Sequence, residues 1–301
     1  MRLIKDIASS DESTRKFIFE TEGMRNLILE FSYIDNGSGK NIICVPTQTM
    51  CNMGCKFCHA SDFISKVWVR PVLWTELSDG IHTVIEAMGI RDSERTLLIS
   101  YMGCGEPLTN VENIVTSMRH IMDRSDIYGP GEKRFAIATM MPKNTLCNML
   151  ELTSQAMKHE LPLKMHLSLH YTEDKTRQEY MPAASDIYTS MLAMQMYREA
   201  TGNAVEIHYS LMSGINDTGQ DISRLIQLVE GTGFNVKFLY HNTKKDVDWG
   251  NTTPETIQAF MKALKSRGID TEFYIPPGLD IGASCGQFLM ERYAEAETCD
   301  E

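Results

Sequence analysis

The amino-acid sequence predicts an α/β fold, a partial (β/α)6 barrel with a short N-terminal β-hairpin and a C-terminal loop and helix extension. From residue 41 onward, short apolar runs alternate with amphipathic helical patterns, which is typical of βαβ units and a parallel sheet. The 301 residues, 43% of them hydrophobic, suffice for one barrel-sized domain with appendages. Roughly six strand–helix units favour an open barrel over a closed eightfold one.

Two strand-like runs, residues 16–20 and 27–34, flank Gly23 and predict the hairpin. The predicted barrel strands are residues 41–46, 96–102, 134–139, 163–169, 204–211, 236–241 and 270–275. The expected domains are therefore the hairpin extension over 1–40, the barrel over 41–275 and a C-terminal segment over 276–301.

Apolar residues at helical spacing mark the segments between these strands. The predicted buried faces are Val111, Ile114, Val115, Met118, Ile121 and Met122 in one helix, Ile222, Leu225, Ile226 and Val229 in another, and Ile257, Phe260, Met261 and Leu264 in the last. In this last helix Thr253 is the expected N-cap, Pro254 fits the first turn and Gly268 ends it.

Composition limits the class of protein. The N-terminus has no apolar signal core, and no run approaches the roughly 18 apolar residues of a membrane span, so we expect a cytoplasmic protein. Eight cysteines without a secretory signal indicate a reducing compartment, where thiols serve metals or catalysis. The net charge of −11 argues against a surface that binds polyanions broadly, although a local basic patch would still contact phosphate.

Cys51, Cys55 and Cys58 form one short cysteine run, with Gly54 permitting a tight turn. Three thiolates on a four-iron cube leave one iron without a protein ligand. A zinc ribbon is an alternative, but it normally shows two Cys-x-x-Cys knuckles and this sequence has one. Inert thiols are the other alternative. We interpret the run as the site of an open [4Fe–4S] cluster that holds S-adenosyl-L-methionine, the pattern of radical SAM enzymes.

Polar candidates follow the carboxyl ends of the predicted strands, the edge at which chemistry collects in parallel α/β barrels. After the second barrel strand, Gly105 permits close backbone approach and Glu106 offers a carboxylate to the ammonium group of S-adenosylmethionine. The candidates at the other strand ends are Thr139, Ser168, Leu169, His170, Asn242 and Cys285. Taken singly, such polar residues are more often structural. Their common edge favours a binding role.

Several sequence blocks resemble, in order, those of the radical SAM adenine methyltransferases of ribosomal and transfer RNA, the RlmN/Cfr type. The blocks are SD at 10–11, TRKF at 14–17, Cys44 with Gln48 and Cys51, MGCGEPL at 102–108, SLH at 168–170, MP at 181–182, GIND at 214–217 and DIGASCGQ at 280–287. The resemblance covers the chain from about residue 10 to residue 286.

The resemblance implies a role for each candidate. Cys51, Cys55 and Cys58 would hold the cluster. The groups that bind S-adenosylmethionine would be Gly105, Glu106, Thr139, Ser168, Leu169, His170 and Asn242. Cys285 would carry the methyl group, Cys44 would resolve the covalent adduct, and Glu30 in the hairpin would be the proton acceptor.

The implied reaction is methyl transfer to an sp2 carbon, adenine C2 or C8 in RNA. One S-adenosylmethionine methylates Cys285, and a second supplies the radical that removes hydrogen from the S-methyl group. The carbon radical adds to the base, and a disulfide between Cys44 and Cys285 accompanies release. An electron donor such as flavodoxin or ferredoxin is implied as a partner.

Departures from the family pattern leave the substrate open. Members carry an additional N-terminal RNA-contacting domain, whereas this chain begins almost at the hairpin, and the sequence leaves open whether a separate RNA-binding partner replaces that module. Residues 138–142 put bulkier apolar side chains where the family has a Ser-Thr-Ser-Gly loop, and residues 59–61 and 70–73 also differ. The alternatives are therefore a nucleotide metabolite or peptide as substrate, or a non-catalytic barrel that binds nucleotides or partners.

Overall fold

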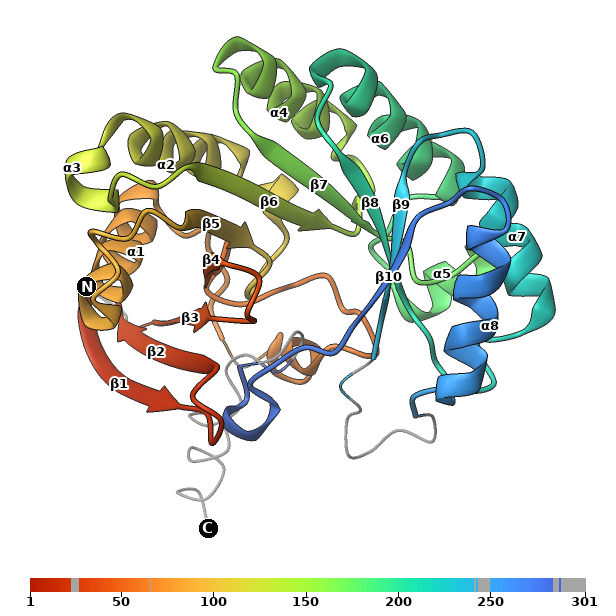
Figure 1. The fold of residues 1–301 in the computed structure, drawn as a ribbon, viewed down its shortest axis with the longest axis horizontal. Helices are drawn as coiled ribbons and strands as arrows, with labels where there is room; N and C mark the ends of the chain where they lie inside the picture. Colours follow the sequence, from red (N-terminus) through yellow and green to blue (C-terminus); the bar gives the residue numbers. More distant parts are fainter. Residues whose placement is uncertain (23–26, 66, 241, 243–249, 284–286, 288–301) are drawn as a thin grey trace.

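The computed structural model describes residues 1–22, 27–65, 67–240, 242, 250–283 and 287 (Figure 1). Their strands form one ten-stranded sheet in which β1 to β10 follow each other in sequence order. Strands β1 to β4 are antiparallel, and β4 to β10 are parallel. Within the described strands, β1 and β10 are the two edges, so the predicted open α/β barrel is confirmed.

The antiparallel strands are β1 (Arg2–Ala8), β2 (Thr14–Glu20) and β3 (Ile28–Ile34). The parallel strands are β4 (Lys40–Cys44), β5 (Thr96–Tyr101), β6 (Lys133–Thr139), β7 (Leu163–Ser168), β8 (Val205–Ser210), β9 (Asn235–Leu239) and β10 (Thr271–Tyr274). Each of the seven predicted barrel strands forms within a few residues of its expected bounds. In β4 to β8 most residues are buried in the barrel wall, as their apolar character predicts.

The α-helices are α1 (Trp74–Met88), α2 (Val111–Asp123), α3 (Ser125–Tyr128), α4 (Leu146–Lys158), α5 (Asp174–Tyr180), α6 (Ile187–Thr201), α7 (Gly219–Val229) and α8 (Pro254–Lys265). Short 3-10 helices are η1 (His59–Phe63), η2 (Pro107–Thr109) and η3 (Leu279–Ile281). In Figure 1 the helices lie outside the arc of strands, so that each crossover returns the chain to the start of the next parallel strand. In the described part of the chain, no helix combines the length and the apolar character that crossing a membrane requires.

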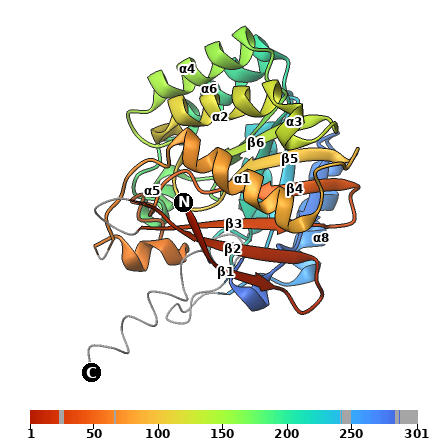
Figure 2. The ribbon, with the colours of Figure 1, turned by 90° about the vertical axis from the view of Figure 1, so that its left-hand side faces the viewer.

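Strand β1 is an element that the sequence pattern did not predict. Figure 2 shows it beside β2 and β3, extending the sheet at its N-terminal edge. Its side chains are almost all exposed, so it lacks the apolar alternation that marks a half-buried strand. Backbone pairing with β2 and surface ion pairs hold it, including Arg15 with Asp6 and Arg2 with Glu20.

The predicted helix faces are largely buried, with one correction in α2. Met122 is 43% exposed, whereas Met118 and Ile121 are fully buried. The buried stripe is narrower than predicted, since a step of about 100° per residue carries Met122 past the packed face. In α8 the predicted cap forms, with the Thr256 amide donating to Thr253 Oγ1 at 3.3 Å.

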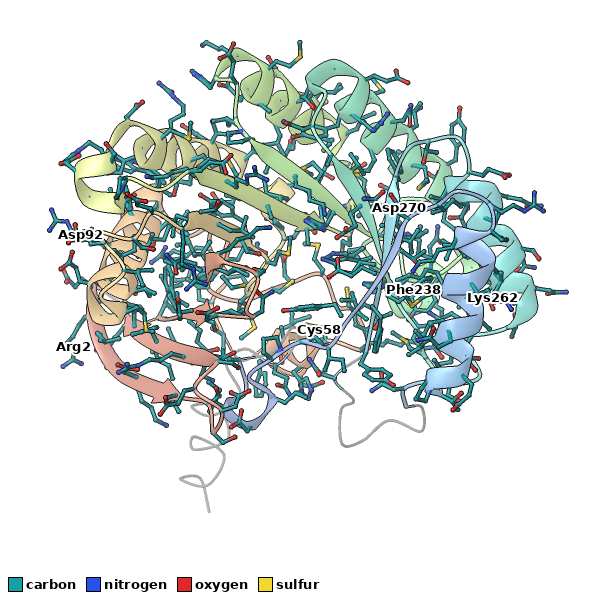
Figure 3. All side chains as sticks on the ribbon, viewed as in Figure 1. Arg2, Cys58, Asp92, Phe238, Lys262 and Asp270 are labelled. Carbon is teal, nitrogen blue, oxygen red and sulfur yellow. The ribbon has the colours of Figure 1, made fainter. Side chains whose placement is uncertain are left out.

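Helix α8 closes its side of the barrel through aromatic packing. The Phe260 ring lies 5.8 Å from that of Phe238 on β9 and 6.1 Å from that of Tyr209 on β8, measured between centroids. Phe260 and Phe238 are fully buried, and Figure 3 shows Phe238 beside α8 and Lys262 on its outer side. This contact fixes the outer wall of β8 and β9, whose opposite faces line the interior.

Replacing Phe260 with alanine should lower the free energy of unfolding by about 3–5 kcal/mol, because it leaves a cavity beside the two remaining aromatic rings. The measurement is the urea midpoint of the protein. Lys262→Ala on the exposed side of the same helix is the matched control and should leave the midpoint nearly unchanged. Equal shifts in the two variants would contradict the packing assignment.

Candidate active site

The strands enclose a cavity of about 790 Å³ whose wall includes Cys44, Cys51, Cys55 and Cys58. Figure 3 shows Cys58 within the arc of strands, away from the outer helices. Four predicted site residues, Gly105, Glu106, Ser168 and His170, contribute to the same wall, and Asn242 joins them. Side chains that are distant in sequence therefore meet in one interior space at the carboxyl ends of the strands.

The cysteine loop follows β4 and is held by backbone contacts at both ends. The amide of Lys56 donates to the Tyr180 carbonyl at 2.8 Å, and the amide of Cys58 donates to the Cys55 carbonyl at 3.0 Å. Gly54 takes a φ of +71°, the conformation that the tight turn requires. The loop thus curls with its three thiols toward the cavity.

The three thiols influence one another electrostatically. Burial, with the neighbouring charge of Cys58 as a smaller cause, raises the pKa of Cys51 to about 12. Burial also raises the pKa of Cys55, with Cys58 and Cys51 adding to the effect. Three clustered sulfur atoms that resist ionisation alone are suited to a cationic iron–sulfur centre, because a bound metal deprotonates its thiol ligands. The donor set therefore fits a [4Fe–4S] cluster.

Glu106 is buried and ordered by neighbouring loops. Its Oε1 accepts hydrogen bonds from the Leu108 amide at 3.0 Å and from Thr139 Oγ1 at 2.6 Å, and its Oε2 accepts one from the Met140 amide at 3.1 Å. Burial raises the pKa of Glu106 to about 7, although these donors partly oppose the shift. An ammonium group bound beside Glu106 would stabilise the ionised form of this buried carboxylate and so lower its pKa again.

Gly105 lies against the loop after β4. It takes a φ of +110°, and a Cβ atom there would come within 2.5 Å of the Gln48 amide nitrogen. Gln48 in turn accepts a hydrogen bond from the Glu106 amide at 2.9 Å through its Oε1. Glycine at this position lets the two strand-end loops touch.

The remaining rim residues have separate roles. His170 takes a φ of +53°, and its Nδ1 accepts a hydrogen bond from the Ser210 amide at 3.0 Å. Thr139 and Leu169 are not among the described residues that line the cavity: Thr139 orients Glu106, and Leu169 is fully buried in the core. Of the predicted binding residues, Thr139 and Leu169 therefore lie behind the residues that form the cavity wall.

Sequence reasoning missed Arg177, which is fully buried. Its guanidinium donates to the carbonyls of Ser168 at 2.9 Å and Met140 at 2.7 Å, and also to that of Leu169. Burial lowers the pKa of Arg177 to about 10, so it stays charged at neutral pH. The only sequence signal was an arginine among polar residues of a short amphipathic helix, which most often marks an exposed side chain.

Glu30 is buried on β3, and it is not among the described residues that line the cavity. Its Oε1 lies 3.7 Å from Nζ of the fully buried Lys16, which also donates to the Gly282 carbonyl at 3.4 Å. The Ser10 amide donates to Asp280 at 2.8 Å, so the segment that ends at Ala283 docks on the N-terminal strands, as Figure 1 shows for η3. Cys285 follows this segment and lies outside the described residues.

Comparison with known proteins decides the family. No protein-family model matches the chain. It is 29% identical over 300 residues to the probable dual-specificity RNA methyltransferase RlmN of Clostridium perfringens, covering 98% of this chain and 80% of the relative. The protein of the same name from Lachnospira eligens is 30% identical over 257 residues, which are 85% of this chain and 69% of the relative. The chain belongs to the RlmN family.

Solved structures agree with this RlmN-family assignment. A radical SAM methyltransferase from Sphaerobacter thermophilus matches 95% of this chain and 80% of its own, with a TM-score of 0.79 and 25% identity. SuiB from Streptococcus suis, solved with S-adenosylmethionine bound, matches 80% of this chain and 51% of its own with a TM-score of 0.53 and 11% identity, which shows a shared fold. The protein is therefore an enzyme of the radical SAM methyltransferase class.

The buried guanidinium of Arg177 should be essential for the shape of the rim. Arg177→Gln leaves several carbonyl oxygens without their donor, each at a cost of about 1–3 kcal/mol, so the urea midpoint should fall sharply. Arg124→Gln, at an exposed arginine paired with Asp126, should leave the midpoint unchanged. A stable Arg177→Gln protein would show that the strand ends need no central cation.

Proposed function

We propose that this RlmN-family enzyme transfers a methyl group from S-adenosylmethionine to an sp2 carbon of adenine, C2 or C8, in RNA. The observation that carries the proposal is the shared cavity, in which Cys44 lies with the three cysteines of the cluster loop and with Glu106. RNA is proposed as the substrate because the relatives bear the name RNA methyltransferase.

In this proposal Cys51, Cys55 and Cys58 hold a [4Fe–4S] cluster. When bound, this group supplies the one-electron chemistry that an unreactive carbon requires, with the electron coming from a flavodoxin or ferredoxin. Glu106 receives the ammonium group of S-adenosylmethionine. The other proposed contacts are Gly105, Ser168, His170 and Asn242, with Thr139 and Leu169 supporting them from behind the wall. The thiols and the cluster suit a reducing compartment such as the cytoplasm.

Cys285 is the proposed carrier of the methyl group, and Cys44 the thiol that forms a disulfide with it as the product leaves. Cys44 pairs with Ser32 across β3 and β4, and Ser32 pairs with Lys16 across β2 and β3. Glu30 lies two residues before Ser32, so Lys16, Glu30 and Cys44 share the face of the sheet that Cys44 turns to the cavity. Glu30 is therefore the proposed proton acceptor, next to the segment that leads to Cys285.

The decisive experiment follows the methyl group on the protein. Anaerobic protein with its cluster reconstituted is incubated with S-adenosylmethionine and digested, and one added methyl group is expected on the peptide that contains Cys285. Cys285→Ala should abolish the adduct, whereas Cys147→Ala, at an exposed thiol on α4, should retain it.

A second variant separates carrier from resolving thiol. Cys44→Ala should still accept the methyl group on Cys285 but should accumulate protein joined covalently to the RNA, detected as a slower band on a denaturing gel. If methylated RNA forms normally with Cys285→Ala, the two-thiol mechanism is wrong even though the family assignment stands.

A non-RNA substrate, a nucleotide metabolite or a peptide, is the second candidate, and the net charge of −11 favours it. Anaerobic binding to transfer RNA and to ribosomal RNA fragments at several salt concentrations distinguishes the two. Affinity that falls steeply with salt supports RNA, because cationic side chains then displace counterions. Absence of RNA binding, together with methylated Cys285, would favour the small substrate.

Binding of S-adenosylmethionine should depend on the ionisation of Glu106. The pKa of about 7 means that the carboxylate is protonated at lower pH and no longer attracts an ammonium group. Affinity should fall about fivefold from pH 7 to pH 6, as equilibrium dialysis of the reconstituted protein would measure. Glu106→Gln should bind weakly with no such pH dependence, and an unchanged pH profile in that variant would exclude Glu106 as the ammonium partner.

A further inference from the structure

A second polar cluster lies in the same cavity, apart from the cysteine loop. His166 on β7 and Glu206 on β8 are paired in register, and His208 follows two residues after Glu206, so the three side chains share one face of the sheet. Glu206 and His166 are buried, and His208 is nearly so, with 12% of its side chain exposed. His166 and His208 both line the cavity.

Three potential ligand atoms converge in this cluster. His166 Nδ1 lies 2.8 Å from His208 Nε2 and 3.1 Å from Glu206 Oε1, and His208 Nε2 lies 3.6 Å from the same oxygen. Tetrahedral ligands about 2.0 Å from a zinc ion lie about 3.3 Å from one another. The three distances bracket this value.

Glu206 Oε1 is a buried oxygen that has no well-aligned hydrogen bond from the described residues, although Lys237 Nζ and His166 Nδ1 each lie 3.1 Å from it. A single proton between the two imidazole nitrogens would satisfy both of them but would leave this oxygen with its ion pair to Lys237 alone. A cation at the centre of the triangle would engage all three atoms at once. An ion pair with Lys237 leaves the two imidazole nitrogens out of the interaction, so the convergence of all three ligand atoms within 4.8 Å of one another favours such an occupant.

We propose that His166, Glu206 and His208 bind a divalent metal ion of the zinc class, with an open coordination position toward the cavity. Two imidazoles and one carboxylate form a ligand set found in catalytic zinc sites. None of the three residues belongs to the proposed methyl-transfer machinery, and the inference does not rest on the proposed function.

Two neighbouring lysines each contact one carboxylate oxygen of Glu206 and so decide which oxygen is free to bind a metal ion. Lys164 Nζ binds the other carboxylate oxygen, Glu206 Oε2, at 2.8 Å, which leaves Oε1 for a single metal bond. Lys237 Nζ lies 3.1 Å from Oε1 and is the cation that competes most directly for this oxygen. Lys237 has a second carboxylate within 3.4 Å, that of Glu272, to which it would shift when the ion binds.

An ion here would be a Lewis acid inside the cavity that also contains the cysteine loop. Its open position would take a water molecule or an oxygen or nitrogen atom of a substrate, such as a phosphate oxygen or a ring nitrogen. The site would therefore help to hold the substrate in the barrel interior.

Zinc binding can be measured without any reaction. Reconstituted protein is freed of loose metal with a chelator, dialysed anaerobically against micromolar zinc, and analysed for iron and zinc by mass spectrometry. The wild type should retain one zinc per chain in addition to its iron. His208→Ala and Glu206→Gln should each lose at least tenfold in zinc affinity while keeping the iron, and His82→Ala, at an exposed histidine paired with Glu86, should match the wild type.

Two further results test the site when a buried variant fails to fold. Lys237→Gln should bind zinc more tightly, because the competing cation is gone. The extended X-ray absorption fine structure of zinc in the wild type should show nitrogen and oxygen ligands at about 2.0–2.1 Å, whereas sulfur at about 2.3 Å would place the ion on cysteines instead. Sulfur ligation, absence of zinc uptake by the wild type, or weaker uptake in Lys237→Gln would each overturn the proposal.

Discussion

The loops at the carboxyl ends of the parallel strands, which form the rim of the barrel, depend on the buried guanidinium of Arg177. Arg177 carries its charge into the core and distributes its donors over the carbonyls at the end of β7 and after β6. Parallel strands leave these carbonyls without ladder partners where they end, so the interior would otherwise be lined by orphaned acceptors. With them satisfied, Thr139 and the Met140 amide are fixed in place to hold Glu106, and the rim residues face a common space. The position of Glu106 in the cavity wall is thus set by an arginine that is not among the described residues lining the cavity.

Periodicity and spacing were sufficient to predict the barrel and much of the site. Strands β4 to β8 are rich in apolar residues and most of their residues are buried, and such runs leave a strong trace in sequence. Because parallel strands present their carboxyl ends at one edge, the cysteine loop, Glu106, Ser168 and His170 could be grouped before any coordinates were known. All of them line the cavity. The roles that the family resemblance assigns to them remain predictions.

What the sequence did not predict depends on contacts between distant residues. Strand β1 is exposed and is held by pairing with β2, which periodicity does not reveal. Lys16 on β2 contacts Glu30 on the neighbouring strand and also donates to the Gly282 carbonyl. Lys16 and Gly282 are 266 residues apart in the sequence, so this contact joins the N-terminal strands to a segment near the end of the described chain. The convergence of His166, Glu206 and His208 required the register of β7 against β8, because a shift of one residue would turn them to opposite faces.

The linear order of the sheet has a mechanical consequence. In a closed barrel, any widening of the interior stretches a continuous ring of backbone hydrogen bonds. Here β1 and β10 are separate edges among the described strands, so the two halves of the wall can move apart without breaking a ladder between them. The segment from Gly278 to Ala283 follows β10 and contacts the N-terminal strands, where Asp280 accepts a hydrogen bond from the Ser10 amide and the Gly282 carbonyl accepts one from Lys16 on β2. Among the described residues, these few contacts therefore oppose a separation of the two sheet edges, a task that a continuous strand ladder performs in a closed barrel.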